Sequence, residues 1–154
     1  MPLYDEAFAL IRANLEELKT GNKVSKFRRA VAVGTLTKVQ LEALNQQRQL
    51  PLYPPMIEEV VFIGSHIYNS RIEEDGYTID DVLDQIASAM DSISVVHAGP
   101  GMTAMQNLSP RADRYGNFVR DKLILECSGR YPRPELFSVM PKGDRIKPKK
   151  PLKE

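Results

Sequence analysis

The chain has 154 residues, of which 42% are hydrophobic, so it is long enough to bury the core of one globular domain. Its net charge of +1 hides an asymmetry: residues 109–154 carry twelve positive and six negative charges, which favours an anionic partner such as RNA or DNA. The chain has one cysteine, which excludes an intrachain disulfide and predicts a reducing, cytoplasmic compartment. Its two histidines are not closely spaced, which argues against a zinc site. It has no apolar run of about 20 residues and no signal-peptide pattern, which predicts a protein without a membrane partner.

The first fifty residues are predicted to form a helical arm. An amphipathic helix is expected over residues 3–19, and a second over 24–33 that ends at Gly34. A third begins at Thr37, which forms a capping box with Gln40, and runs to about residue 48. The last two also fit a helix-turn-helix, but the second of them carries few basic residues, so a helical layer or a dimerising arm is the preferred interpretation.

The proline-rich segment 49–55 is the one plausible boundary in the chain. It separates the arm, residues 1–50, from an α+β body over residues 56–144. Residues 145–154 carry several basic side chains and no apolar periodicity, and they are expected to form a flexible basic tail.

The body begins with a buried strand over residues 60–63, where four large apolar residues follow one another. Ser65 is a candidate N-cap for a short helix over residues 66–71. A longer helix over residues 78–90 is the clearest in the chain, because its apolar residues recur at helical spacing and Thr78 forms a capping box with Asp81. Leu83 and Ile86 are expected to be among the most buried residues.

The rest of the body is predicted to be a sheet. Residues 93–97 and 102–108 form a hairpin around a Gly-Pro-Gly turn, and strands follow over 118–127 and 135–140. The predicted fold class is therefore α+β: an N-terminal helical arm followed by a four- to five-stranded antiparallel sheet with one helix packed on one face.

Candidate functional residues gather in two places. The first is the corner between the buried strand and the short helix, with His66, Ser70 and Arg71. The second is the polar face of the 118–127 strand and the loop before it, with these residues: Arg111, Arg114, Tyr115, Arg120, Lys122 and Glu126. A sheet covered by helices on one face leaves its other face open, so the topology is able to bring both groups together.

This set of side chains suits cleavage of an RNA phosphodiester bond. One group takes the proton from the 2′-hydroxyl, another protonates the leaving 5′-oxygen, and an arginine or lysine stabilises the charge on phosphorus. No metal and no cofactor are needed when the ribose hydroxyl is the nucleophile.

The segments 64–71 and 76–83 resemble phage-encoded members of the barnase, EndoU, colicin and RelE superfamily of ribonucleases. The resemblance extends over residues 58–142 in element order, and in individual residues over His66, Ser70 and Arg71. It implies metal-independent RNA cleavage with His66 as general acid or base and Arg71 or Arg120 on the phosphate. Partners of such a toxin-like enzyme would be RNA and an inhibitor protein.

Several alternatives remain open at this stage. His66 also suits a structural role at the corner, Arg71 also suits pairing with the acidic residues 73–75, and Glu126 with Arg120 also suits a solvated ladder on the strand. His97 is a candidate for the second acid or base. The alternative function is a non-catalytic nucleic-acid-binding or protein-interaction adaptor that forms a homodimer through its N-terminal helices.

Overall fold

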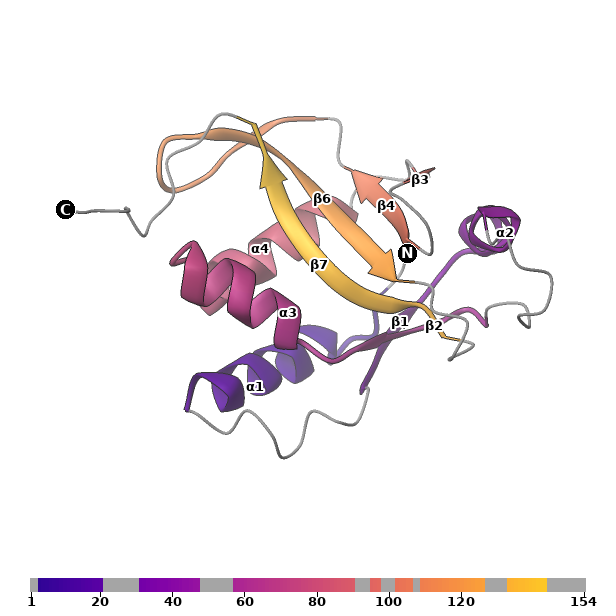
Figure 1. Cartoon of the computed structure of the whole chain (residues 1–154), viewed down its shortest axis with the longest axis horizontal. Helices are drawn as coiled ribbons and strands as arrows, with labels where there is room; N and C mark the ends of the chain where they lie inside the picture. Colours follow the sequence, from indigo (N-terminus) through magenta and orange to yellow (C-terminus); the bar gives the residue numbers. More distant parts are fainter. Residues whose placement is uncertain are drawn as a thin grey trace.

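The computed structural model describes residues 3–20, 31–47, 57–90, 95–97, 102–106, 109–126 and 133–143. Its helices are α1 (Ala7–Lys19), α2 (Lys38–Gln47), α3 (Ser65–Ile67), the π-helix η2 (Tyr68–Glu74) that continues α3, and α4 (Ile79–Met90). Its strands are β1 (Val31–Thr35), β2 (Glu59–Phe62), β3 (Val95–His97), β4 (Met102–Gln106), β5 (Arg111–Ala112), β6 (Phe118–Glu126) and β7 (Glu135–Lys142). The α+β class is confirmed (Figure 1).

The described strands form one mixed sheet in the order β1-β2-β7-β6-β4-β3, with β5 paired to β6 off this path. All pairs are antiparallel except β2 with β7, where Val61 lies opposite Glu135. The sequence predicted four or five antiparallel strands, and the structure differs because β7 returns beside β2 at the end of the chain. The hairpin of β3 and β4 is confirmed, and β2 is flanked by strands on both sides.

The strand β1 corrects the helix expected over residues 24–33. Residues 31–35 pair with β2 instead, and the rest of that expected helix lies outside the described residues. A short apolar run that includes Val31 and Val33 is compatible with a helix or a strand. Here it forms a strand, because its backbone pairs with the edge of β2. Without that helix, the described residues contain no helix-turn-helix at this place.

The N-terminal segment shares its core with the body. Ile11 and Leu15 of α1 are fully buried and belong to the same hydrophobic cluster as Ile86 of α4 and Leu123 of β6. Of the described part of residues 1–50, α1 thus belongs to the helical layer of the body and β1 to its sheet, whereas α2 lies at the side of the molecule (Figure 1). The predicted tail, residues 145–154, lies outside the described residues.

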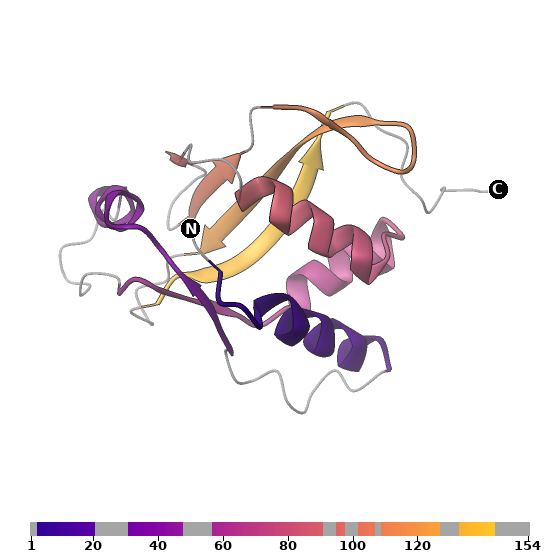
Figure 2. The ribbon, with the colours of Figure 1, turned by 180° about the vertical axis from the view of Figure 1, so that it is seen from behind.

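The helix α4 covers one face of the sheet, as predicted. It packs on β4, β6 and β7 and against α1, and Figure 2 shows it across that face. Both capping boxes are confirmed: the Thr78 amide donates to Asp81 Oδ2 at 2.9 Å, and the Thr37 amide donates to Gln40 Oε1 at 2.9 Å. Ile86 is fully buried and Leu83 is 9% exposed.

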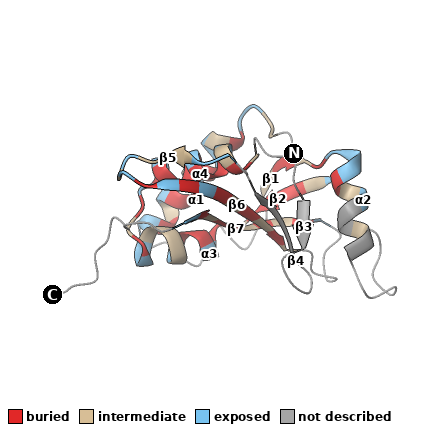
Figure 3. Cartoon of the chain, turned by 90° about the horizontal axis from the view of Figure 1, so that it is seen from above, coloured by how far each residue is buried: buried red, intermediate tan, exposed pale blue. Residues whose placement is uncertain are grey.

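The opposite face of β6 and β7 is the one that positions the candidate site. Buried and exposed residues alternate along β6, which Figure 3 shows from above. We call this side the outer face, and it consists of these residues: Phe118, Arg120, Lys122, Ile124 and Glu126 of β6, and Glu135, Phe137, Met140 and Lys142 of β7. Within the part of the chain that is described, no helix is long and apolar enough to cross a membrane.

Candidate functional site

The corner between β2 and α3 depends on a glycine and on an asparagine from α1. Gly64 has φ +93°, a left-handed conformation that favours glycine, and it caps α3 in place of the expected Ser65, which is the first helical residue. Asn14 Nδ2 donates a hydrogen bond to the Ile63 carbonyl at 2.9 Å. A Cβ atom on Gly64 would collide with Asn14 Oδ1, so the close approach of α1 also favours glycine here.

This corner presents His66 to the outer face. Its ring stacks on Phe137 of β7, with ring centroids 4.3 Å apart and planes inclined by 15°. Ser70 Oγ lies 3.5 Å from His66 Nε2, one helical turn further on. Burial of the ring and then the positive charge of Arg71 lower the pKa of His66 below its usual 6.5, against the opposing effect of Glu74 and Glu126. The imidazole is therefore mainly neutral at pH 7.

Arg71 points into the protein rather than onto the outer face. Its Nη1 lies 3.3 Å from Asp75 Oδ2, and the two side chains are 14% and 5% exposed. Arg71 Nε is buried without a hydrogen-bond partner among the described residues. The positive charge of Arg71 thus acts on the pKa of His66, while its guanidinium pairs with Asp75 of the acidic 73–75 turn, the alternative that the sequence left open.

Two glutamates face each other beside this histidine. Glu126 at the end of β6 lies directly opposite Glu135 at the start of β7. Side chains in such cross-strand positions have Cβ atoms about 4.5–5.5 Å apart, so the like charges repel. Burial, and then the charge of Glu126, raise the pKa of Glu135 to about 7. Glu126 acts on the pKa of His66 as well as on that of Glu135, and we call these three residues the His66 cluster.

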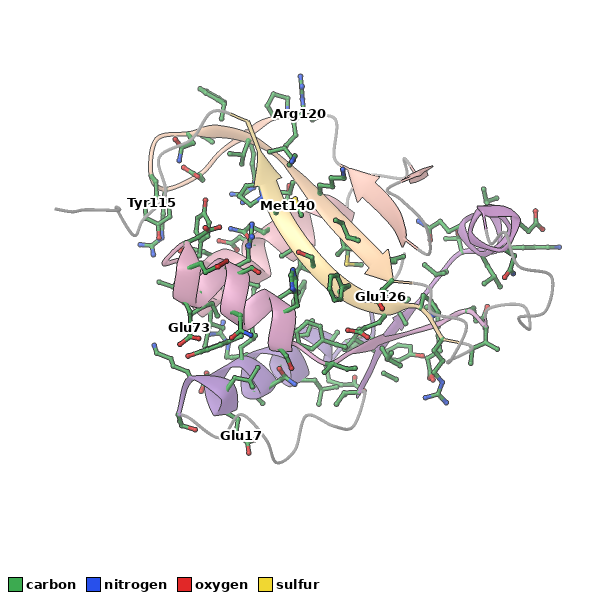
Figure 4. The ribbon with its side chains drawn as sticks, in the orientation of Figure 1. Glu17, Glu73, Tyr115, Arg120, Glu126 and Met140 are labelled. Carbon is green, nitrogen blue, oxygen red and sulfur yellow. The ribbon has the colours of Figure 1, made fainter. Side chains whose placement is uncertain are left out.

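The other end of the outer face is basic. Arg120 lies opposite Lys142, and both are exposed, while the half-buried Lys122 lies opposite Met140. Arg120 lies near the start of β6 and Glu126 at its end, with Met140 between them on β7 (Figure 4). Six residues of strand span about 20 Å, so Arg120 shares a face with His66 but not a contact.

Three predicted substrate-binding residues lie away from this face. Arg111 forms an ion pair with Asp121, whose side chain points inward from β6 and is fully buried. Arg114 Nε donates to Asp81 Oδ1 at 2.8 Å, and Tyr115 donates its hydroxyl hydrogen to Asp81 Oδ2. Figure 4 shows Tyr115 at the hairpin of β5 and β6, far from Glu126. The polar loop of the sequence is thus tied to α4.

Opposite shifts of pKa accompany this second network. Burial acts to raise the pKa of Asp81, but hydrogen bonds from Arg114, Tyr115 and Thr78 outweigh it and lower the pKa to about 2. Burial and Asp81 raise the pKa of Tyr115 to about 12. Asp81 is thus held ionised and Tyr115 protonated over the physiological range, which suits a structural role.

The sequence did not single out Glu135, Phe137 or Asn14. The signal for Glu135 is its position opposite Glu126, which requires the register of β6 and β7 and cannot be read from spacing along the chain. His97 ends β3, two strands from β6, and its side chain lies outside what is described. Among the described residues, no group of three or more histidine, cysteine, aspartate and glutamate side chains is arranged to hold a metal ion.

Comparison with known proteins adds no relative: no family model, no curated protein and no solved structure matches the chain. The resemblance to ribonucleases therefore stays a prediction that rests on His66, Ser70 and Arg71. The chemistry of the cluster is defined by its own groups. A neutral imidazole is able to accept a proton, and a carboxyl group with a pKa of about 7 is able to donate one.

Proposed function

We propose that the protein is a ribonuclease that cleaves RNA without a metal ion, at a site formed on the outer face by His66, Glu135 and Glu126. One observation carries this proposal. The imidazole of His66, whose pKa is lowered, stacks on Phe137 of β7. The carboxyl group of Glu135, whose pKa is raised to about 7, lies two residues before Phe137 on the same face of that strand. Such a divergence of pKa values is typical of acid and base partners in an active site.

The proposed roles follow from the protonation states. His66 accepts the proton of the ribose 2′-hydroxyl, and the 2′-oxygen forms a bond to phosphorus. The bond from phosphorus to the 5′-oxygen breaks, and Glu135 donates its proton to that oxygen. The products are a 2′,3′-cyclic phosphate and a free 5′-hydroxyl, and proton exchange with water restores both groups.

Two neighbours support these roles. The charge of Glu126 favours the protonated form of Glu135, which keeps an acid available near pH 7. Lys122 is the first basic residue along β6 from Glu126, and we assign it to the charge that develops on the phosphate oxygens. Arg71 is a positioning residue, because it pairs with Asp75 and acts on the pKa of His66.

The adaptor interpretation has less support. A dimer through the N-terminal helices would use the apolar stripe of α1, but Ala7, Ile11 and Leu15 of that stripe are fully buried inside the chain. A toxin-like enzyme with an inhibitor protein and RNA as partners is consistent with the proposed site, and a phage origin is part of the same proposal.

The test is incubation with mixed-sequence RNA in EDTA. We expect wild-type protein to leave 2′,3′-cyclic phosphate ends, and His66→Ala and Glu135→Gln each to lower the rate by about 10²–10⁴-fold. The pH profile of kcat/KM should be bell-shaped, with an alkaline limb near pH 7 that disappears in Glu135→Gln. Glu42→Gln changes an exposed carboxylate on α2 and serves as the matched control.

Two results would count against the proposal. Absence of cleavage by wild-type protein across many RNA sequences would remove it, and tight RNA binding without cleavage would favour the adaptor interpretation. An unchanged alkaline limb in Glu135→Gln would instead remove Glu135 from the role of acid while leaving the activity in place.

A further inference from the structure

An exposed aromatic ring stands at the basic end of the outer face. Phe118 is 72% exposed, whereas every other phenylalanine and tyrosine among the described residues is buried or partly buried. It lies opposite Ala112 of β5, whose small side chain leaves the ring open. Burial in the core therefore does not explain this ring. A single exposed apolar residue needs no explanation by itself, and its neighbours give it significance.

Two cations lie beside the ring on the same face. Arg120 follows Phe118 by two residues, which places both side chains on one side of β6. Lys142 lies directly opposite Arg120, and both residues are exposed. Like charges in opposite positions repel each other across the strand pair, and the two cations concentrate positive charge beside the ring. An aromatic ring next to paired cations is the combination that binds a base together with its phosphate.

We propose that Phe118, Arg120 and Lys142 form a second subsite on the outer face, at which an unpaired base of single-stranded RNA stacks on Phe118 while its phosphates contact the two cations. This inference rests on the proposed ribonuclease function and extends it by naming the substrate class. The strand must be single, because a base inside a duplex does not present its ring to a protein side chain.

The distance between subsite and cluster sets the length of the substrate. Phe118 and Glu126 are the two ends of β6, and eight residues of strand span about 26 Å. At a stacked rise of about 3.4 Å per nucleotide, roughly eight nucleotides cover that distance, and fewer cover it when the strand is extended. A dinucleotide is therefore long enough to bind at the His66 cluster, but too short to contact the cluster and the Phe118 subsite at the same time.

The chain offers a direct probe of this subsite, because it contains no tryptophan. Phe118→Trp introduces a single tryptophan at an exposed position, and its emission can be excited separately from that of the tyrosines. The ligand is a twelve-nucleotide single strand with 2′-O-methyl groups, which lacks the nucleophilic hydroxyl and so is bound without being cleaved. We expect saturable quenching of the tryptophan by this strand and none by a duplex of the same sequence at equal concentration.

Two further variants separate stacking from other contacts. Phe118→Ala and Phe118→Leu should each weaken binding of the labelled twelve-nucleotide strand, Phe118→Ala by about 5- to 150-fold, the equivalent of one stacked base. Ile57→Ala changes another exposed apolar residue and should leave binding unchanged. Arg120→Gln with Lys142→Gln should reduce the slope of log K against log salt by about 1.4, the value for two phosphate contacts on a single strand.

The outcomes are distinguishable from those of the cleavage test. Absence of quenching by the single strand, or equal quenching by the duplex, overturns the subsite whether or not the protein cleaves RNA. Quenching by the single strand alone supports the subsite even if the His66 cluster proves inactive. Equal binding by Phe118→Leu and wild-type protein overturns stacking as the basis of recognition.

Discussion

The pKa values of two carboxyl groups, one on each side of the sheet, are shifted in opposite directions. On the side of α4, Asp81 is held by Arg114, Tyr115 and Thr78, and its pKa falls to about 2. On the outer face, Glu135 lies opposite Glu126, and its pKa rises to about 7. The first carboxylate has every partner that a negative charge needs, whereas the second is partly buried beside another negative charge.

The difference separates a stabilising network from a reactive one. Asp81 closes the capping box of α4 and ties the β5–β6 hairpin to that helix, so its ionised form stabilises the fold. Glu126 and Glu135 lie opposite each other and repel when both are ionised, which opposes the pairing of their strands. Local arrangements that oppose stability are found most often at functional sites. The outer face is therefore the place to look for chemistry.

The largest loss of stability is expected when the ion pair between Arg111 of β5 and Asp121 of β6 is broken. Arg111→Met leaves the fully buried Asp121 without its cation, and breaking such a buried pair typically costs about 3–5 kcal/mol. The matched control is Arg120→Met, which changes an exposed arginine on the other face of the same strand and should alter the free energy of unfolding by about 0.5 kcal/mol or less. Urea denaturation at pH 7 measures both.

Equal effects of these two variants would erase the distinction between the faces. In that case Arg111 would contribute no more to stability than Arg120, and the sequence-based prediction that Arg111 binds substrate would be favoured again.

A smaller effect is expected at Asp81, and it depends on pH. Asp81→Asn removes charge-assisted hydrogen bonds and should lower the free energy of unfolding by about 1.5–3 kcal/mol at pH 7. Because the folded pKa of about 2 lies below the usual 3.8, this stabilisation is present above pH 3.8 and is lost as the pH falls through 2. The difference between variant and wild type should narrow from pH 4 downward.

The neighbouring residue provides the control for Asp81. Asp80 also forms an ion pair, with Arg12, but the two side chains are 74% and 42% exposed. Asp80→Asn should therefore change the free energy of unfolding by about 1 kcal/mol or less. A larger loss at Asp80 than at Asp81 would contradict the assignment of the network.

The features that could be predicted from the sequence depend on residues that lie close together in the chain, and the features that were missed depend on residues far apart in it. The capping box of Thr78 and Asp81 and the two faces of β6 depend on residues within a few positions of each other, and they could be predicted. The grouping of His66 with Ser70 is equally local. The pairing of Glu126 with Glu135 depends on strand register, including an irregularity between Ile124 and Leu125, and no local pattern reveals it.

The same limit explains the arginines of the loop. Basic residues beside a polar strand face suggest a surface for RNA, but a two-residue strand, β5, turns Arg111 toward Asp121 and not toward the outer face. The acidic partners, Asp81 and Asp121, come from α4 and from the inward side of β6. That these aspartates pair with Arg114 and Arg111 depends on the tertiary arrangement, so the sequence alone does not predict it.

The smallest expected effect on stability has the opposite sign, and it tests the comparison most directly. In the folded state Glu135 has a pKa of about 7, above its usual 4.5, so its ionised form is disfavoured by folding. The cost of burying the ionised carboxylate, to which the repulsion by Glu126 adds, is absent below pH 4.5 and grows as the pH rises through 7, so wild-type protein loses stability over this range. Glu135→Gln should match wild type at pH 4 and exceed it by about 1 kcal/mol at pH 8, allowing for solvent screening of a half-exposed group.

A variant that is more stable and less active would establish what the pair does. Asp81→Asn is expected to lose stability as a neutral residue replaces a satisfied charge, whereas Glu135→Gln is expected to gain it and to lose cleavage of RNA. Thermal or urea unfolding at pH 4 and pH 8 measures the first property, and the EDTA cleavage assay measures the second. If Glu135→Gln is instead destabilised equally at both pH values, the residue serves packing or strand pairing, and the cluster with His66 loses its acid. A gain of stability at pH 8 with unchanged cleavage would leave the repulsion real but unrelated to catalysis, because relief of repulsion and loss of a proton donor are separate consequences of the same substitution.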